Sequence, residues 1–512
     1  MPDNLASFKI FCAGGLNTSR DVLSQGELAP GSAIALINYE PAVTGGYRKI
    51  NGYSNDYGTV PGSGDVLGVV VANGVDDGIL ACRWNTSDSD YFYSWNETTE
   101  EWDTVTTPDT VDVSTVTKIR FSRLNWGTPK VFLTDGVNRG ASYDGTTYTQ
   151  VTHANAPTAP KFSAVFQNHM FLAGDPAEVT NLYFSSPYNE LDYAPGNGSG
   201  VVNVGFPIVS IKPFRDALYI FGSNNIRKLT GNNISNFVLE NVTDDLGCLA
   251  SDSVIEIAGD LLFLSQDGLR PVSGTNKIGD VNLETISKDI QSVFTDIVFD
   301  VDLDGLNAVV IRQKTQFRIF FKAADSQGII GAFRQGDQGL QFNYGQLLGI
   351  EATAADSGYL GQYEFVIHGD STGKVYRQER GNSFDGNDIF SVYQTPYLHM
   401  QDPEVRKIIY TVSTYLRSEG DNTLVLSAVY DYEDFNTLSP NNYTLTTSGA
   451  AAYYNEALYD STAIYDGNPS PVQRTNISGS GRAVSFKYVT NDTSASHSIQ
   501  GIVVTYGIGD RR

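Results

Sequence analysis

The residues that could carry chemistry in this 512-residue sequence are scattered along the chain. Its histidines stand singly, with no HExxH motif and no partner at the spacing of a zinc site. They are His153, His169, His368, His399 and His497. A lone histidine needs only a surface position or one hydrogen-bonded interior position, so we assign none of them to catalysis or metal binding.

Two glycine-containing segments resemble catalytic motifs but depart from them in spacing. GDSTGKV, which begins at Gly369, has three residues between its glycines where a phosphate loop needs four. Val375 also stands where a magnesium-binding hydroxyl is required, so we interpret the segment as a hairpin turn. In GNGSG, Asn197 replaces the first glycine of a nucleophile elbow around Ser199. Neither segment predicts a catalytic site.

The sharpest metal candidate is the trio Asp300, Asp302 and Asp304, followed by Gly305. Alternate carboxylates and a glycine bend are what a calcium loop needs to surround the ion with oxygen atoms. The distal ligands are missing, because Ala308 and Ile311 occupy the ninth and twelfth positions. The sequence therefore favours a solvated acidic turn, with these three aspartates as a weak metal candidate, and we predict no bound cofactor.

This lack of motifs favours a structural protein, and we predict that the chain is not an enzyme. Carboxylates are plentiful, so the composition also permits a pair suited to glycoside hydrolysis. No repeated Asp-box phrase of the sialidase kind occurs.

Charge and cysteine content narrow the function classes further. With 34 basic and 58 acidic residues the formal net charge is −24, which argues against a surface that binds nucleic acid by counterion release. Cys12, Cys82 and Cys248 show no CxxC or zinc spacing and predict buried thiols made in a reducing cytoplasm. The N-terminus lacks a signal-peptide pattern, and no apolar run has the length of a membrane span.

Short alternating segments, rich in β-branched and aromatic residues and separated by DG, GN, GD and NG pairs, predict an all-β protein. The sequence predicts one short helix, in VNLETISKDIQSVFTDI from Val281. There Ile286, Ile290 and Phe294 fall at helical spacing behind Asn282 or Thr285 as caps.

A loose unit of roughly 35–50 residues recurs through the middle of the chain, which is the period of a propeller blade. Blades stacked around an axis cover each other's faces, whereas one four-stranded sheet alone leaves both faces exposed. We therefore predict a β-propeller of six blades, a count that seven would also fit; the same alternation also permits a β-sandwich or a pair of barrels. The six units are 67–105, 117–151, 161–205, 208–242, 252–281 and 306–347, and the segment 363–381 either finishes the sixth unit or begins a seventh.

The propeller is expected over residues 58–393, after an N-terminal segment 1–57 that packs with the C-terminal domain. In residues 394–512 the strands are longer and alternate strictly, which predicts a C-terminal β-sandwich or platform domain. A long aromatic connection, from Tyr443 to Tyr465, is expected to contact a partner.

The order of several phrases along the chain resembles podophage tail nozzle proteins, also called packaged-DNA stabilisation or tail tubular B-type proteins. The opening carries a GGLN phrase, a Pro-Gly pair, an apolar phrase ending in Asn, and a Gly-rich turn that closes on Gly-Tyr. IVSIKPFRDALYIFGSNNIRKLTG, EVRKIIYTVSTYLRSEGD and IQGIVVTYGIGDRR resemble later parts of that family. The opening residues are Gly14, Gly15, Leu16, Asn17, Pro30, Gly31, Asn38, Gly45, Gly46, Gly52 and Tyr53.

This resemblance implies a virion protein of a bacteriophage tail, synthesised in the bacterial host cytoplasm. It implies a homo-hexamer below the head-to-tail adaptor, a channel through which phage genomic DNA passes on ejection, retention of the packaged genome, and side surfaces that hold a tail fibre or tailspike. The alternative that we retain is a tail-associated β-propeller that binds or hydrolyses host-surface glycan.

Overall fold

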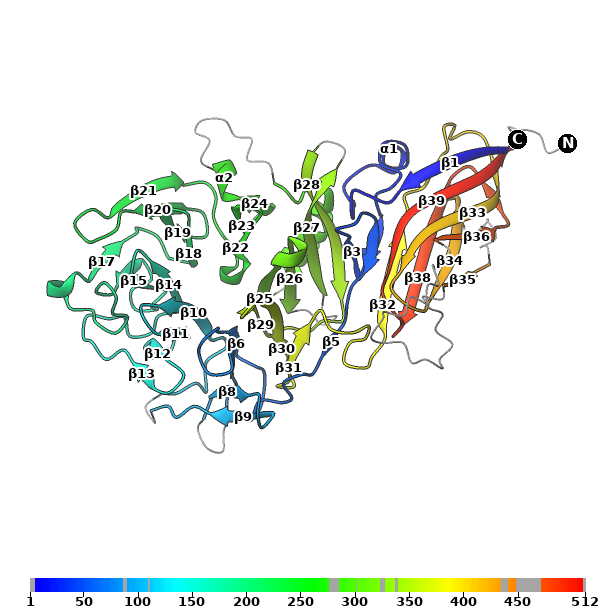
Figure 1. Cartoon of the computed structure of the whole chain (residues 1–512). Coiled ribbons are helices and arrows are strands. Elements are labelled where there is room, and N and C mark those ends of the chain that lie inside the picture. Colours follow the sequence, from blue (N-terminus) through cyan, green and yellow to red (C-terminus); the bar gives the residue numbers. More distant parts are fainter. Residues whose placement is uncertain are drawn as a thin grey trace.

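The computed structural model describes residues 5–85, 90–108, 111–275, 285–300, 302–322, 327–336, 339–433, 441–447 and 471–509. This part of the chain is almost entirely β-structure, in which a propeller lies beside a domain of long strands (Figure 1). The predicted all-β fold is therefore confirmed. Most of the aromatic connection expected to contact a partner, from residue 448 onward, lies outside the described residues.

Six small antiparallel sheets form the blades, which confirms the predicted six-bladed propeller (Figure 1). The first blade has β6 (Gly68–Val71), β7 (Ile79–Cys82), β8 (Phe92–Asn96) and β9 (Glu101–Thr104). The second has β10 (Arg120–Asn125), β11 (Pro129–Thr134), β12 (Ala141–Tyr143) and β13 (Tyr148–Gln150). The third has β14 (Phe162–Phe166), β15 (His169–Ala173), β16 (Asn181–Phe184) and β17 (Gly200–Asn203). The fourth has β18 (Ser210–Phe214), β19 (Ala217–Phe221), β20 (Ile226–Thr230) and β21 (Val238–Thr243). The fifth has β22 (Ile255–Ile257), β23 (Asp260–Ser265) and β24 (Gly268–Pro271).

The last blade is completed by a strand from the N-terminal segment. It contains β29 (Ala354–Leu360), β30 (Tyr363–Gly369), β31 (Val375–Gln378) and β5 (Tyr53–Ser54). Tyr53 pairs with Gln378 and Ser54 with Arg377, across more than 300 residues of sequence. The ring is therefore closed by joining its first and last parts, which covers a blade edge that would otherwise be open.

The predicted sixth unit, 306–347, does not make a separate blade, and this part of the prediction is corrected. It forms β25 (Asp302–Ile311), β26 (Gln316–Lys322), β27 (Gln327–Gly336) and β28 (Gly339–Leu348), the first four strands of a nine-stranded sheet. β25 nevertheless contacts both β22 and β29, so these four strands fill a seventh sector between the fifth and the last blade. A propeller blade and the strands β25 to β28 have the same local alternation of strands and turns. Only the long-range pairing of β28 with β2 shows that these strands belong to the larger sheet.

Burial follows the position of each strand. The strands β7, β15 and β19 lie inside their blades and are buried at every residue, because neighbouring blades cover both faces. Separate apolar clusters fill the spaces between successive blades. In the C-terminal part, β34 (Asn422–Tyr430) alternates buried and half-buried residues, as expected where one face is in the core.

The domain of long strands contains two sheets that share one large apolar core. The nine-stranded sheet continues from β28 through β2 (Ala35–Ile37), β32 (Ile389–Gln394), β38 (Val484–Asp492) and β34 to β35 (Tyr443–Thr447). The seven-stranded sheet contains β1 (Leu5–Phe11), β3 (Tyr39–Pro41), β4 (Tyr47–Lys49), β33 (Lys407–Ser418), β36 (Val472–Asn476), β37 (Ser480–Gly481) and β39 (His497–Ile508). The N-terminal strands β1 to β4 thus belong to these two sheets, whereas β5 belongs to the propeller.

The helices are few and short. The expected helix is present as η3 (Lys288–Ile290) and α3 (Gln291–Asp300), with Ile290 and Phe294 buried; 281–284 lie outside the described residues. The sequence analysis missed α1 (Val22–Leu28), which the side chain of Asp21 caps by accepting a hydrogen bond from the Ser24 amide. The remaining helical turns are α2 (Val272–Thr275), η1 (Pro195–Asn197), η2 (Ser251–Ser253), η4 (Arg312–Lys314) and η5 (Asp431–Glu433).

Candidate functional site

The histidines lie far apart, and most of them are interior residues. His169, His368 and His497 are almost fully buried, and burial lowers the pKa of His368 and of His497 to about 3. His497 shares a hydrogen bond of 2.7 Å with the Tyr39 hydroxyl, and His399 one with the hydroxyl of Tyr432. In the described residues no three His, Cys, Asp or Glu side chains gather closely enough to hold a metal ion.

The segment GDSTGKV forms the turn between β30 and β31, which confirms the predicted hairpin. The Asp370 carboxylate accepts hydrogen bonds from the amides of Thr372 and Lys374, so it stabilises the turn. Ser199 of GNGSG is buried and has no base beside it among the described residues.

The three candidate aspartates do not form one loop. Asp300 ends α3 and Asp302 begins β25, and their side chains are outside the described part of the structure. Asp304 is exposed and lies 3.6 Å from the Lys161 Nζ. The weak metal candidate gains no support from this arrangement.

The first group of residues behind the family resemblance fastens the N-terminal segment to the nine-stranded sheet. The Leu16 amide donates to the Tyr344 carbonyl, and the Asn17 side chain donates to Asp289 at 2.8 Å. Gly14 and Gly15 both have positive φ. A Cβ on Gly15 would lie 2.6 Å from the Tyr344 amide nitrogen, so the close approach requires glycine.

The second group connects the same segment to the seven-stranded sheet and to the last blade. Gly45 and Gly46 turn with positive φ between β3 and β4. A Cβ on Gly52 would lie only 1.8 Å from the Ser383 carbonyl oxygen. Tyr53 stacks on Phe384 with ring centroids 4.9 Å apart. These motif residues therefore determine how the parts of the chain are joined, and none of them lines the central cavity of the propeller described below.

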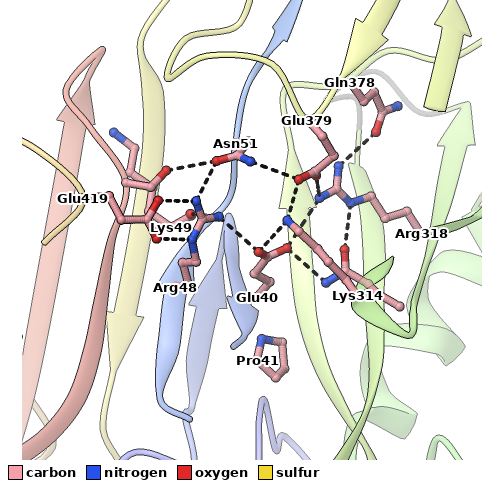
Figure 2. A network of polar contacts seen from close by, with 12 residues as sticks. Glu40, Pro41, Arg48, Lys49, Asn51, Lys314, Arg318, Gln378, Glu379 and Glu419 are labelled. Atoms are coloured by element: carbon pink, nitrogen blue, oxygen red, sulfur yellow. Dashed lines mark hydrogen bonds and ion pairs between the residues drawn. The ribbon is translucent and has the colours of Figure 1, made fainter. Parts of the chain in front are cut away.

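A partly buried network of charges lies at this junction (Figure 2). Glu40 of β3 accepts hydrogen bonds from Arg48 at 3.2 Å and from Lys314 at 2.7 Å. Arg48 also binds Glu419 through two nitrogen atoms, each 2.6 Å from an oxygen. The geometry of that pair is bidentate, which is the strongest arrangement of a guanidinium and a carboxylate.

The network continues into the seventh sector and the last blade (Figure 2). Arg318 of β26 is fully buried and pairs with Glu379, which follows β31, and donates to Gln378 at 2.9 Å. Lys314 also pairs with Glu379. Burial would raise the pKa of Glu379, but the charges of Arg318 and Lys314 outweigh it and hold that pKa below its usual value. Every charged group named in this network has an ion-pair partner.

A different set of charges surrounds the cavity at the centre of the propeller. The cavity has a volume of about 490 Å³ and is lined by the innermost strand of each of the seven sectors. Among its lining residues are five cations and three carboxylates, so its formal charge is 5 − 3 = +2 within a chain of −24. They are Lys118, Arg120, Arg123, Lys212 and Arg312, with Asp252, Glu256 and Asp356.

Asp252 forms ion pairs with two of these cations. Lys118 Nζ lies 2.9 Å from its carboxylate, and Arg120 donates to it through two nitrogen atoms at 2.9 and 2.7 Å. Burial would raise the pKa of Asp252, and the two cations hold it well below the usual range. The remaining nitrogen of the guanidinium, Arg120 Nη1, is buried and has no hydrogen-bond partner among the described residues.

The other cations of the cavity are only partly neutralised. Arg123 pairs with Asp356, and Arg312 lies 3.4 Å from Glu364, which is outside the cavity lining. Lys212 makes no hydrogen bond or ion pair with any described residue, and its side chain is exposed to the cavity solvent. The surrounding protein and the nearby charge of Arg123 lower its pKa. The arrangement leaves the ammonium group of Lys212 without a described partner beside a space of ligand size.

The sequence analysis did not identify this site. Lys118, Arg120 and Arg123 are visible in TKIRFSR, and Lys212 in SIKPFR, as basic residues on strands that begin a repeat unit. These residues share one position, at the start of a repeat unit, and the first strand of every blade faces the axis. This shared position is the feature of the sequence that could have identified the site.

No known protein family and no curated protein matches this sequence. Several solved structures match it at low similarity. An ancestral GH74 enzyme is 10% identical, covers 73% of this chain and 53% of its own, and has a TM-score of 0.39. The computationally designed protein Ika8 is 11% identical, with 63% and 98% covered and a TM-score of 0.32. An exo-β-1,3-galactanase from Phanerochaete chrysosporium is 9% identical, with 89% and 100% covered and a TM-score of 0.26. The chain thus spans about half the length of the GH74 enzyme.

The prediction that the chain is not an enzyme is corrected by these matches. Glycoside hydrolases are among the matching structures, and the absence of sequence motifs does not by itself exclude catalysis. At identities of 8–10% the likeness concerns the fold alone and assigns no activity to this chain. None of the described helices is long and apolar enough to cross a membrane.

Proposed function

We propose that this chain is a subunit of the nozzle of a short-tailed phage tail, a homo-hexamer below the head-to-tail adaptor that surrounds the path of the ejected genome, retains the packaged genome and holds a fibre or tailspike. The observation that carries the proposal is the structural role of the motif residues. Gly15 and Gly52 permit backbone contacts that any side chain would prevent, and Tyr53 closes the ring. The resemblance therefore rests on positions that determine this architecture.

Under this proposal the DNA path lies between copies of the chain. The central cavity of the propeller, at about 490 Å³, has the volume of a small-molecule site. A duplex whose major groove alone is about 12 Å wide needs a much larger opening. Six chains would together carry 6 × (−24) = −144 formal charges, which suits a conduit that repels DNA and lets it slide.

The test is the assembly state of the purified chain, alone and mixed with the adaptor of the same phage, in negative-stain images. We expect rings with a six-fold axis and an open lumen in at least one of these samples. Monomers in both samples would contradict the proposal. A DNA-binding series at increasing salt tests the repulsive lumen, since tight binding at low salt that weakens steeply would indicate a basic channel.

The second candidate is a tail-associated propeller that binds or hydrolyses host-surface glycan. The specific observation in its favour is the polar central cavity, whose volume falls within the range of roughly 300–1,000 Å³ for ligand pockets. The test is binding to, and release of reducing ends from, host-surface polysaccharide. Saccharide binding or cleavage by a monomer would favour this candidate, whereas an assembled ring with neither favours the nozzle.

A further inference from the structure

We infer that the central cavity of the propeller binds a small oxyanion, the carboxylate of an acidic monosaccharide or inorganic phosphate, with Lys212 as its principal contact and Arg120 as a fixed positive charge in the cavity wall. The inference rests on the cavity alone and is independent of the assembly state. Unlike a patch of surface lysines, this site is enclosed by the innermost strands of all seven sectors.

The first argument is the state of the two cations, Lys212 and Arg120. Lys212 lines the cavity, is accessible to solvent there and is unpaired among the described residues. The side chain of Arg120 is only 12% exposed, fixed by two hydrogen bonds to Asp252, and its Nη1 has no described acceptor. Arg120 therefore contributes a fixed positive charge in the cavity wall, and the ammonium of Lys212 is the donor that an oxyanion can reach.

The second argument is the charge that faces the site from every side. Asp252 is shared by Lys118 and Arg120, and Asp356 is engaged by Arg123 and by the Val71 amide. Glu256 is the remaining carboxylate, exposed on the neighbouring strand β22. Glu364 is the partner of Arg312 from outside the lining, so five cations face four carboxylates and the excess is 5 − 4 = +1, which one monoanion would neutralise.

The third argument concerns the chemical class of the ligand. A guanidinium and an ammonium are the groups that bind carboxylate and phosphate oxygens. Ser122, Ser163 and Ser210 line the same cavity; the hydroxyls of Ser122 and Ser210 donate to backbone carbonyls, so their oxygen atoms remain as acceptors for sugar hydroxyls. The volume accommodates a monosaccharide, and the cavity is too small for duplex DNA.

The experiment is isothermal titration of the full chain at low ionic strength with glucuronate, inorganic phosphate and glucose. We expect glucuronate, phosphate or both to bind with millimolar or better affinity and glucose not to bind. The variant Lys212→Met should weaken anion binding at least tenfold, while Lys9→Met, which removes an exposed lysine of β1, should leave it unchanged. Binding should also weaken as salt is raised.

The relative affinities distinguish an acidic sugar, a free oxyanion and a neutral glycan as the ligand. Glucuronate binding well above phosphate identifies an acidic sugar, and the reverse identifies a free oxyanion. Equal binding by the two lysine variants, or no anion binding by the native chain, would overturn the inference. Binding of glucose as strong as that of glucuronate would also overturn it, while favouring a neutral glycan site.

Discussion

The junction network and the central cavity hold similar numbers of charged groups and arrange them differently. At the junction three cations face three carboxylates and each finds a partner (Figure 2). In the cavity four of the five cations pair with a carboxylate, and Lys212 has no partner among the described residues. Where every charged group has a partner, as at the junction, the ion pairs stabilise one arrangement of the side chains, because removing one partner leaves the other charge uncompensated. A charged group without a partner that faces solvent, such as Lys212, is expected to contribute little to stability and is available to a ligand.

The largest effect is expected from breaking the junction. Glu379→Gln keeps the shape of the side chain and removes the charge that pairs with Arg318 and Lys314. Because Arg318 is fully buried, its charge loses its closest partner, and we expect a loss of about 3–5 kcal/mol in the free energy of unfolding. Urea denaturation measures the change. Glu404→Gln, at an exposed position, is the control, and an equal stability for both variants would contradict the role of the network.

The glycines of the same junction give the next comparison. Gly52→Ala should cost about 3 kcal/mol, because the new Cβ would meet the Ser383 carbonyl oxygen at 1.8 Å and the backbone must move. Gly136→Ala should cost about 1–2 kcal/mol, since its φ of 79° is unfavourable for alanine but its nearest neighbour, Lys161, is 3.5 Å away. Thermal unfolding of the two variants checks the order. A reversed order would mean that the junction backbone adapts easily.

Acid should act on the junction through Glu379. The pKa of this carboxyl is about 2 in the folded chain and 4.5 in its ordinary state. Its contribution to the free energy of unfolding is therefore complete above pH 4.5. The contribution is lost as the pH falls from about 4.5 to about 2. We therefore expect the melting temperature of the native chain to fall more steeply across this window than that of Glu379→Gln. Parallel curves would show that Glu379 titrates alike in the folded and unfolded chain.

The fold was predictable where it depends on local sequence, and the site was not. The alternation in IVSIKPFRDALYIF predicts two strands of a blade, and the DG pairs place turns at Gly136 and Gly268, both of which have positive φ. The pairing of β5 with β31 carries no local signal, because its partners lie more than 300 residues apart. The charged residues of the cavity come from strands that are far apart in the sequence, and they form one site only because the ring brings those strands together.

The smallest effect on stability is expected in the cavity. Lys212→Met removes one charge, as Glu379→Gln does, but Lys212 has no described partner to leave uncompensated. The pKa of Lys212 is lowered by the surrounding protein and by Arg123, so the folded chain disfavours its charged form. A base whose pKa is depressed on folding destabilises the folded chain at neutral pH, and its removal should leave stability unchanged or slightly raised, within about 0.5 kcal/mol. Urea denaturation beside Lys9→Met measures the difference. A loss comparable to that of Glu379→Gln would show that Lys212 is a structural ion-pair residue, and the distinction between a saturated junction and an unsaturated cavity would fail.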